Sequence, residues 1–450
     1  MKNHAPQLLM VVALVGSSAC GQEVPQALWL TGAKVLDAAG AGLLDGHNVL
    51  VANGRITRVS PAREMDAPPD ASRLELDGLM LLPGLIDLHS HLLLHPYDEA
   101  SWDDQVLKES LELRTIRAVA AARATLEAGF TTLRDMGTEG AGFADVALRE
   151  AIARGIVPGP RIFASTRAIV ATGCYGPDGF DPRWDVPKGA QVADGVDGVR
   201  RAVREQIAAG ADWVKVYADY RRRPGESPTP TFSQDELSAL VDEARSADRP
   251  VAAHATTEEG IRRAVLAGVA SIEHGNDASD EVLTLMRERG VVLCPTLAAS
   301  EALARYAGWK PGTPDPPRIR AAKGMFARAL RSGVTIACGS DVGVFAHGDN
   351  VRELELMVAY GMSPKEALRA ATSTAARVLG REQDLGRIAA GCVADLIAVR
   401  DDPLDDPAAL RKPLLVVKDG RIMLDRRGSL ALRRSGPGLS SESGPSRHPE

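Results

Sequence analysis

The chain has 450 residues, of which 45% are hydrophobic and 25% are charged, so it can bury a large core and form one barrel with a smaller appendage. Its net charge of -6, with no stretch that concentrates lysine and arginine, argues against a nucleic-acid partner. The strongest basic run, residues 221–225 (RRRPG), is interpreted as a solvated loop.

The first 20 residues have the pattern of a secretory signal peptide. Lys2 precedes an apolar stretch from Leu8 to Val15, and small residues then lead to Cys20. We therefore expect an exported protein. The residues before Cys20 also resemble a bacterial lipoprotein box, so both a periplasmic protein released by simple cleavage and a membrane-anchored lipoprotein with a lipid on Cys20 remain open.

Short alternating segments at the two ends predict a small β domain that is split in the sequence. Residues 26–80 contain such runs with Asn53-Gly54 as a tight hairpin signal, and residues 381–427 repeat the pattern with Asp419-Gly420. Because VANGRITRV and VKDGRIML are alike, we expect both segments to pair in one discontinuous β-sandwich. Residues 428–450, rich in glycine, serine, proline and arginine, are expected to be disordered.

Residues 81–380 alternate predicted strands with amphipathic helices, such as 104–128, 198–209 and 322–332. Ser233, Thr256 and Ser363 each precede a glutamate by three residues and are expected to cap helices. Eight strands are expected, near 81–89, 130–135, 161–165, 212–217, 250–254, 270–274, 291–297 and 333–340. This count predicts an α/β fold, a (β/α)8 TIM barrel.

Four cysteines follow Cys20 at scattered positions, and none has the spacing of a zinc cluster: Cys174, Cys294, Cys338 and Cys392. In a large barrel this distribution favours buried free thiols over a disulfide framework, even though an exported compartment permits disulfides.

Potential metal ligands lie at the ends of successive predicted strands. In LPGLIDLHSHL, His89 and His91 stand at positions i and i+2, so strand alternation turns both imidazoles to one face. The carboxyl ends of barrel strands meet at one face of the barrel, and imidazoles with carboxylates suit Zn(II) and its neighbours. We predict a metal site formed by His89, His91, Lys215, His254, His274 and Asp341.

Lys215 lies within DWVKVY, where alternation directs Trp213, Lys215 and Tyr217 into the barrel. An ammonium group is costly there, and burial lowers the lysine pKa toward the neutral amine. Such an amine can add carbon dioxide to form a carbamate, whose two oxygens can bridge two metals. A lysine that reaches solvent or pairs with an acid is the alternative.

The motifs PGLIDLHSH, VKVY, IEHG and CGSDVG, with the segment that follows them at 347–380, resemble the metal-dependent amidohydrolase superfamily. The similarity runs from about residue 27 to 425, and it is greatest with the branch of prolidase-like Xaa dipeptidases, imidazolonepropionase relatives and ochratoxin-type amide hydrolases. It implies two divalent metals, with Zn(II) expected, and an N6-carboxylated Lys215 that bridges them. By the family pattern His89, His91 and Asp341 hold one metal, and His254 and His274 hold the other.

Two such metals can share a hydroxide and polarise the scissile carbonyl. Asp341 can take the proton of the hydroxide and pass it to the leaving nitrogen, or it can serve as a ligand only. Loop residues at the same barrel end are further candidates. We expect Tyr175, Tyr217 and His347 to stabilise the oxyanion, and Tyr220 and Arg221 to contact the substrate, with Arg221 gripping a carboxylate.

These features predict an exported binuclear hydrolase that cleaves a dipeptide or an N-acyl amino acid, a small-molecule substrate, and that forms a homo-oligomer. Relatives often carry histidine where Tyr175 stands and tyrosine where Thr256 stands, so the identity of the substrate does not carry over. One alternative is a cyclic amide or lactone hydrolase of the imidazolonepropionase type, against which Lys215 argues. Another is a catalytically inactive surface binding lipoprotein, against which the intact ligand set argues.

Overall fold

A computed structural model describes residues 27–430 except 41, 67 and 182. The predicted signal peptide, Cys20 and residues 431–450 therefore lie outside the described residues. The first three residues of the tail predicted to be disordered belong to the short 3-10 helix η3 (Arg427–Leu430). Among the described residues, no helix is both long and apolar enough to cross a membrane.

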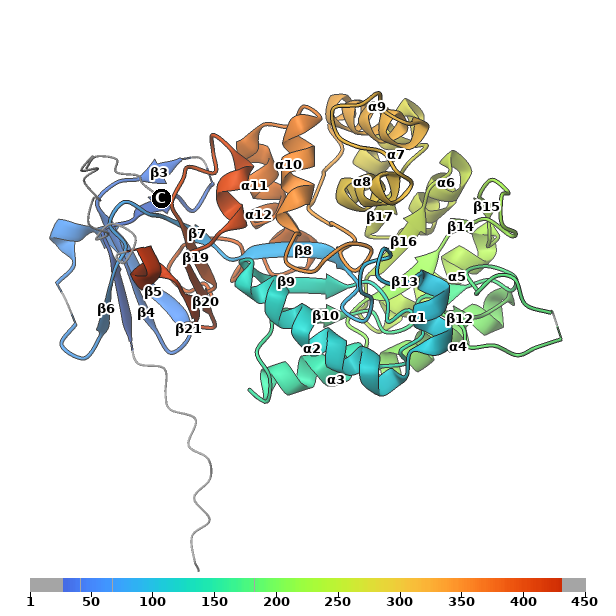
Figure 1. Ribbon diagram of the computed structural model, residues 1–450, viewed down its shortest axis with the longest axis horizontal. Helices are drawn as coiled ribbons and strands as arrows, with labels where there is room; N and C mark the ends of the chain where they lie inside the picture. Colours follow the sequence, from blue (N-terminus) through green and yellow to red (C-terminus); the bar gives the residue numbers. More distant parts are fainter. Residues whose placement is uncertain (1–26, 41, 67, 182, 431–450) are drawn as a thin grey trace, which may run out of the picture.

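In the described part of the chain, ten strands form a β-sandwich at one end of the molecule (Figure 1). One sheet has the order β5-β4-β1-β6, and the other has the order β21-β20-β19-β7-β2-β3, in which β19 pairs antiparallel with β7. The second sheet thus joins both ends of the chain, as predicted. The strands are β1 (Leu28–Thr31), β2 (Lys34–Leu36), β3 (Leu43–Leu44), β4 (His47–Ala52), β5 (Arg55–Pro61), β6 (Ser72–Glu75), β7 (Met80–Pro83), β19 (Leu396–Val399), β20 (Leu415–Lys418) and β21 (Arg421–Asp425).

The two predicted hairpin turns are present in the sandwich. Asn53 and Gly54 have φ values of 51° and 75°, and Asp419 and Gly420 have φ values of 50° and 72°. Positive φ at both central residues is the geometry that a two-residue hairpin requires. A Cβ atom on Gly420 would lie 2.8 Å from the Cα atom of Gly54, so the two turns pack directly against each other.

Parallel strands beside the sandwich form a barrel, which confirms the predicted fold class. Two parallel sheets, β10-β9-β8 and β13-β16-β17-β18, are joined where the Asp212 backbone N–H donates to the Ala164 carbonyl at 2.8 Å. The barrel strands are β8 (Leu85–Ser90), β9 (Phe130–Asp135), β10 (Arg161–Ala164), β13 (Val214–Tyr217), β16 (Val251–Ala255), β17 (Ser271–His274) and β18 (Val292–Cys294). Short strands at its rim are β11 (Ile169–Val170), β12 (Gln191–Val192), β14 (Asp219–Tyr220) and β15 (Thr229–Pro230).

The eighth barrel segment closes the barrel without forming the regular strand predicted at 333–340. It makes only isolated bridges, at Ile336 with β18 and at Val342 with β8. The Cys338 N–H donates to the Ala370 carbonyl at 3.0 Å. This hydrogen bond goes to the end of a helix and not to a neighbouring strand. Gly339 allows the close approach, because a Cβ atom there would lie 3.0 Å from the His89 Cβ atom.

Helices surround the barrel (Figure 1). They are α1 (Trp102–Lys108), α2 (Leu111–Glu127), α3 (Ala144–Ala153), α4 (Gly195–Ala208), α5 (Gln234–Ser246), α6 (Glu258–Ala267), α7 (Asp280–Arg289), α8 (Leu297–Tyr306), α9 (Pro317–Ser332), α10 (Val351–Ala359), α11 (Pro364–Ala370) and α12 (Ser373–Val378). Two further 3-10 turns are η1 (Ala62–Glu64) and η2 (Pro407–Arg411).

The predicted helix at 104–128 is two helices, because Ser110 caps a new helix by accepting from the Leu113 N–H at 3.2 Å. Ser233 and Ser363 form the predicted capping boxes. The predicted cap at Thr256 is wrong by one residue, since Thr257 caps α6 by accepting from the Gly260 N–H at 3.0 Å. Thr256 instead donates its hydroxyl to Asp219 at 3.0 Å.

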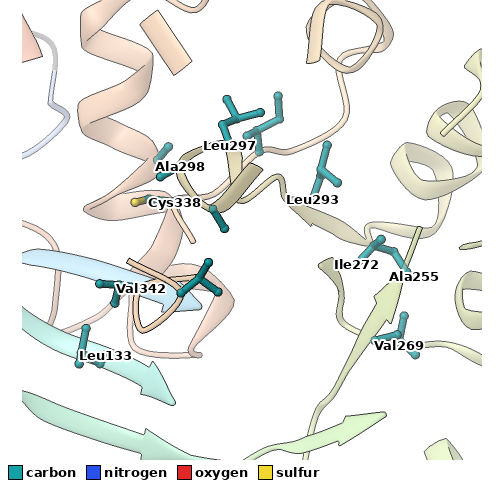
Figure 2. Packing of buried hydrophobic residues seen from close by; sticks show 14 of the residues in the cluster. Leu133, Ala255, Val269, Ile272, Leu293, Leu297, Ala298, Cys338 and Val342 are labelled. Carbon is teal, nitrogen blue, oxygen red and sulfur yellow. The ribbon is translucent and has the colours of Figure 1, made fainter. Parts of the chain in front are cut away.

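Apolar side chains fill the layer between the barrel strands and the helices (Figure 2). Leu133, Ile272 and Leu293 come from strands, and Leu297 comes from α8 (Figure 2). All four are buried. Close packing on this side fixes the strands whose ends carry the polar side chains described next. The predicted buried free thiols are also confirmed for all four described cysteines.

Candidate metal centre and active-site cavity

The predicted ligands meet at the carboxyl end of the barrel. The ring centroid of His89 lies 5.2 Å from the centroids of both His91 and His274, and the His254 and His274 centroids are 4.6 Å apart. Side-chain ligand atoms of His89, His274 and Asp341 all lie within 4.8 Å of one another. The i, i+2 spacing in β8 and the ends of β16 and β17 therefore converge as the sequence predicted.

Hydrogen bonds at Nδ1 orient three of the imidazoles. His89 Nδ1 donates to Glu273 Oε2 at 2.7 Å, and His91 Nδ1 donates to the Gly137 carbonyl at 2.9 Å. The Nδ1 atom of His274 hydrogen-bonds the Thr296 hydroxyl at 2.7 Å. These bonds leave Nε2 available on each ring, which is the arrangement that metal-ligating histidines use.

Glu273 is held in turn by a buried network. Its Oε1 atom accepts from Arg134 Nη2 at 2.8 Å and from the Ser271 hydroxyl at 2.5 Å, and neither Arg134 nor Glu273 is exposed. The Arg134 guanidinium also lies over the Trp213 ring at 4.4 Å. The buried charge of Glu273 is thus paired and fully hydrogen-bonded, which makes it a rigid support for His89.

Asp341 reaches the two histidines of β8 from the eighth segment. Its Oδ1 atom lies 3.3 Å from His91 Nε2 and 3.6 Å from His89 Nε2. Its backbone N–H donates to the His89 carbonyl at 2.7 Å. Asp87, which sequence reasoning missed, fixes this segment by accepting from the Ser340 N–H at 3.0 Å and from Asn350 Nδ2 at 2.7 Å.

The backbone around the centre is held in an unusual conformation. Five non-glycine residues at the barrel mouth have φ between 49° and 74°: Glu139, Tyr175, His274, Thr296 and Asp341. Side chains at positive φ cost energy and persist where the surrounding structure fixes them, most often at functional sites. Two of the five, His274 and Asp341, belong to the predicted ligand set.

The charges of the cluster follow from burial and from its neighbours. Burial, reinforced by Lys215, lowers the pKa of His89 well below its usual range. Burial lowers the pKa of His274 to about 4, so its imidazole is neutral at pH 7. Burial raises the pKa of Asp341, but attraction to His89 and His91 outweighs it and keeps the carboxyl ionised. Burial lowers the pKa of His91, but the hydrogen bond to Asp341 and the charge of Glu139 outweigh it and raise this pKa to about 9. His91 is therefore protonated at pH 7 and must lose that proton to become a ligand, since neutral imidazoles and a carboxylate are the protonation states that bind metals.

Lys215 lies in the middle of this cluster, at 1% exposure. Burial lowers its pKa, as the sequence predicted. Among the described residues, its ammonium nitrogen has neither a hydrogen bond nor an ion pair, and its one aromatic neighbour is the Tyr217 ring at 5.5 Å. Tyr217 stacks on His254 at 4.4 Å between centroids.

A cavity of about 440 Å³ opens above the cluster. Tyr175, Tyr217, Tyr220 and Arg221 line it, as predicted. His347 is not among its lining residues, because its Nε2 atom donates to the Leu94 carbonyl at 3.1 Å. The structure therefore gives no support to the prediction that His347 contacts the oxyanion.

Several lining residues were not singled out from the sequence, notably Tyr97 and Arg318. Glu139, beside the cavity, was also missed; it lies in the loop that follows β9. Its Oε2 atom accepts from the Tyr175 hydroxyl and from Trp102 Nε1 at 2.8 Å. Its Oε1 atom is 3.5 Å from His91 Nδ1.

Comparisons with known proteins agree with this geometry. The family model described as the amidohydrolase family matches residues 80–423. Ochratoxinase from Aspergillus niger is 33% identical over 371 residues, which cover 75% of this chain and 73% of that protein. A crystal structure of a Xaa-Pro dipeptidase with methionine bound in the active site has a TM-score of 0.79 and 32% identity, and the match covers 88% of this chain and 99% of that one. A prolidase complexed with N-methylphosphonate-L-proline has a TM-score of 0.77 and 33% identity over the same shares of the two chains.

Proposed function

Because this chain belongs to the amidohydrolase family and is a metal-dependent hydrolase of carbon–nitrogen bonds, we propose that it cleaves the amide bond of a dipeptide or an N-acyl amino acid at a binuclear centre. The observation that supports two metals is the buried position of Lys215 without a polar partner among the described residues. A buried ammonium that has neither a hydrogen bond nor an ion pair is unfavourable, whereas a neutral amine in the same place can react with carbon dioxide.

The donor set fits two divalent metals. We assign His89, His91 and Asp341 to one metal, His254 and His274 to the other, and carboxylated Lys215 to both. Carboxylation joins the nitrogen of the neutral Lys215 amine to the carbon of carbon dioxide and releases one proton, which turns the amine into an anionic, two-oxygen ligand. An ammonium group must first lose a proton of its own, so two protons leave when the cation becomes the carbamate. When bound, the metals supply a water-derived nucleophile at neutral pH and polarise the scissile carbonyl.

The chain's own residues supply orientation and proton transfer. Asp341 is ionised and lies at the centre, so it can accept a proton on a carboxylate oxygen and return it to the leaving nitrogen. Tyr175 donates its hydroxyl proton to Glu139, and we therefore assign the contact with the substrate oxygen to Tyr217. Glu273 and Asp87 keep the histidines and Asp341 in place.

The size and polarity of the cavity support a substrate of dipeptide size. Its volume of about 440 Å³ lies within the range of small-molecule sites, and Arg221 and Arg318 line it as cations. The two related structures with a bound amino acid or a proline phosphonate also hold ligands of this kind. We assign the α-carboxylate of the substrate to Arg221.

We also propose that the protein is exported. The support is the charged, apolar and small-residue order of residues 1–20, which lie outside the described part of the chain.

A screen of metal-loaded protein against dipeptide and N-acyl amino acid libraries tests this function. The expected result is release of the C-terminal amino acid from a subset of the compounds, loss of the activity with a chelator and its return with Zn(II). Asp341→Asn is the matched control, and it should be inactive in the same fold. A metal-loaded protein that hydrolyses none of the amides would contradict the proposal.

A further inference from the structure

A second cavity adjoins the active-site cavity. Its volume is about 390 Å³, and Tyr175, Tyr220 and Arg221 line both cavities. The Tyr175 and Tyr220 rings meet edge to face with centroids 5.1 Å apart. This pair of rings, which we call the tyrosine partition, therefore separates the metal centre from the second cavity.

Positive charge dominates the second cavity. Four cationic side chains line it against one acidic side chain, Asp178: the cations are Lys188, Arg221, Arg222 and Arg223. Three of these arginines belong to the RRRPG run. Its residues are exposed, as predicted for a solvated loop, and the three arginines also border the cavity, so three like charges gather at one wall.

The arginines of this cavity make few and weak hydrogen bonds and ion pairs. Arg221 pairs with Asp178 at 3.5 Å with both side chains substantially exposed, and exposed pairs of this kind contribute little. Within the described residues, the Arg222 side chain donates only to the Thr172 and Pro230 carbonyls, at 3.5 Å each. Among the described residues, the Arg223 side chain has neither a hydrogen bond nor an ion pair. The nearby acid Asp194 is occupied by hydrogen bonds to Thr172.

Apolar side chains form the rest of the wall, including Val170, Val186, Ala190 and Val192. A ligand for this cavity therefore combines a short apolar stem with an anionic end. Arginine favours carboxylates, because its planar fork can donate two parallel hydrogen bonds.

We propose that the second cavity is a specificity subsite that receives the side-chain carboxylate of the substrate's C-terminal residue. This inference rests on the proposed function. Arg221 stands at the boundary of the two cavities, so a C-terminal residue whose α-carboxylate meets Arg221 can extend its side chain past the tyrosine partition toward Arg222 and Arg223. The substrate class is then a dipeptide or N-acyl amino acid that ends in an acidic residue.

The test compares substrates that end in glutamate with isosteric substrates that end in glutamine. The wild-type protein should prefer glutamate by about 10- to 100-fold in kcat/KM, mainly through KM, because the charged group gains hydrogen bonds to arginine. The double variant Arg222→Gln/Arg223→Gln should bring the ratio close to 1 and leave the rate with glutamine unchanged. Arg183→Gln is the control: Arg183 pairs with Asp181 at 2.6 Å and does not line the cavity.

Equal wild-type rates for the two substrates would overturn the subsite, and so would a glutamate preference that the double variant retains. A preference for glutamate only at the N-terminal position would overturn its placement beyond Arg221. Calorimetric binding of glutarate separates this inference from the proposed function. If no amide is hydrolysed, the subsite predicts that glutarate binds the wild-type protein and the Arg183→Gln protein but binds the double variant at least 10-fold more weakly, whereas equal binding to all three would refute it.

Discussion

The role that can be assigned to Lys215 depends on its surroundings in the folded protein. In the sequence it is a lysine at the inward position of an apolar strand, and a solvent-reaching or paired lysine was an open alternative. In the structure the side chain is 1% exposed and has neither a hydrogen bond nor an ion pair among the described residues, which favours the proposed reaction of the amine with carbon dioxide over both alternatives.

Replacing Lys215 tests this reaction. Lys215→Ala removes an anionic two-oxygen ligand and should lower metal content and turnover by orders of magnitude. Lys215→Arg should not restore them, since a guanidinium stays protonated. Short carboxylic acids such as acetate should partly rescue the alanine variant by filling the vacated space. Lys418→Ala, in the sandwich, is the matched control.

Elemental analysis measures the loss of metal, and a rate assay with added acetate measures the loss of turnover and its rescue. Near-normal activity of Lys215→Ala with two metals still bound would refute the carbamate bridge. Loss of activity without any rescue by carboxylic acids would support a purely structural lysine.

The two arginines of the active-site cavity allow a second residue-scale prediction. Converting the substrate's C-terminal carboxylate to an amide should cost about 1.5–3 kcal/mol of transition-state binding, or about 10- to 100-fold in kcat/KM. Arg221→Ala should abolish most of this penalty, and Arg318→Ala, which removes a cation at the start of α9, should retain it. A penalty that disappears only in Arg318→Ala would move the carboxylate away from Arg221.

At the scale of elements, the ligands at strand ends were easier to predict from the sequence than the residues that hold those ligands in place. His89, His91, His254, His274 and Asp341 end apolar segments, so the common end of the parallel strands gave their place, and strand alternation gave the direction of His89 and His91. Glu273 and Asp87 lie one or two residues from these ligands, but their partners, such as Arg134 and Asn350, are distant in the sequence. Only the closed barrel brings them together, and local patterns carry no signal of it.

The same limit explains the errors in element boundaries. The eighth strand had the right apolar pattern, but its N–H at Cys338 is diverted to the end of α11 at Ala370. Thr256 had the sequence of a helix cap, but Asp219 competes for its hydroxyl. Both outcomes depend on tertiary hydrogen bonds that propensity rules do not contain.

Glu353 on α10 supports α8 and gives a prediction at this scale. It is fully buried, and it accepts from the first backbone N–H groups of α8, at 3.0 Å from Leu297 and 2.7 Å from Ala298. Glu353→Ala should lower the free energy of unfolding by about 1–3 kcal/mol, because it leaves these donors unsatisfied. Glu353→Gln keeps an acceptor and should cost less.

The pH dependence of stability checks the same residue. Burial raises the pKa of Glu353 from 4.5 to about 8, so the folded protein binds its proton more tightly than the unfolded chain. The stabilisation from this group is complete below about pH 4.5 and is lost as the pH rises through 8. Denaturant unfolding between pH 5 and 9 should therefore show Glu353→Gln gaining stability relative to wild type as the pH rises. A difference that stays constant with pH would contradict the raised pKa.

At the scale of the whole molecule, the sandwich was predicted because both chain ends carry the same hairpin pattern, and the barrel was predicted from eight strands that alternate with helices. The predicted export signal, at residues 1–20, lies outside the described residues. Cell fractionation should find the mature protein outside the cytoplasm, and Cys20→Ser should release it from membranes if Cys20 carries a lipid. Wild-type protein that is already soluble in the periplasm would keep the export prediction and dismiss the anchor, whereas protein retained in the cytoplasm would contradict export.

Titration of the apoprotein with metal, followed by an activity assay at each step, tests whether a binuclear metal centre hydrolyses the amide. Apoprotein should regain full activity only as its metal content approaches two ions per chain, with His254→Ala and His274→Ala each reducing both quantities together. Activity should therefore follow the second equivalent of metal. A stable preparation that is fully active with one metal per chain would contradict it.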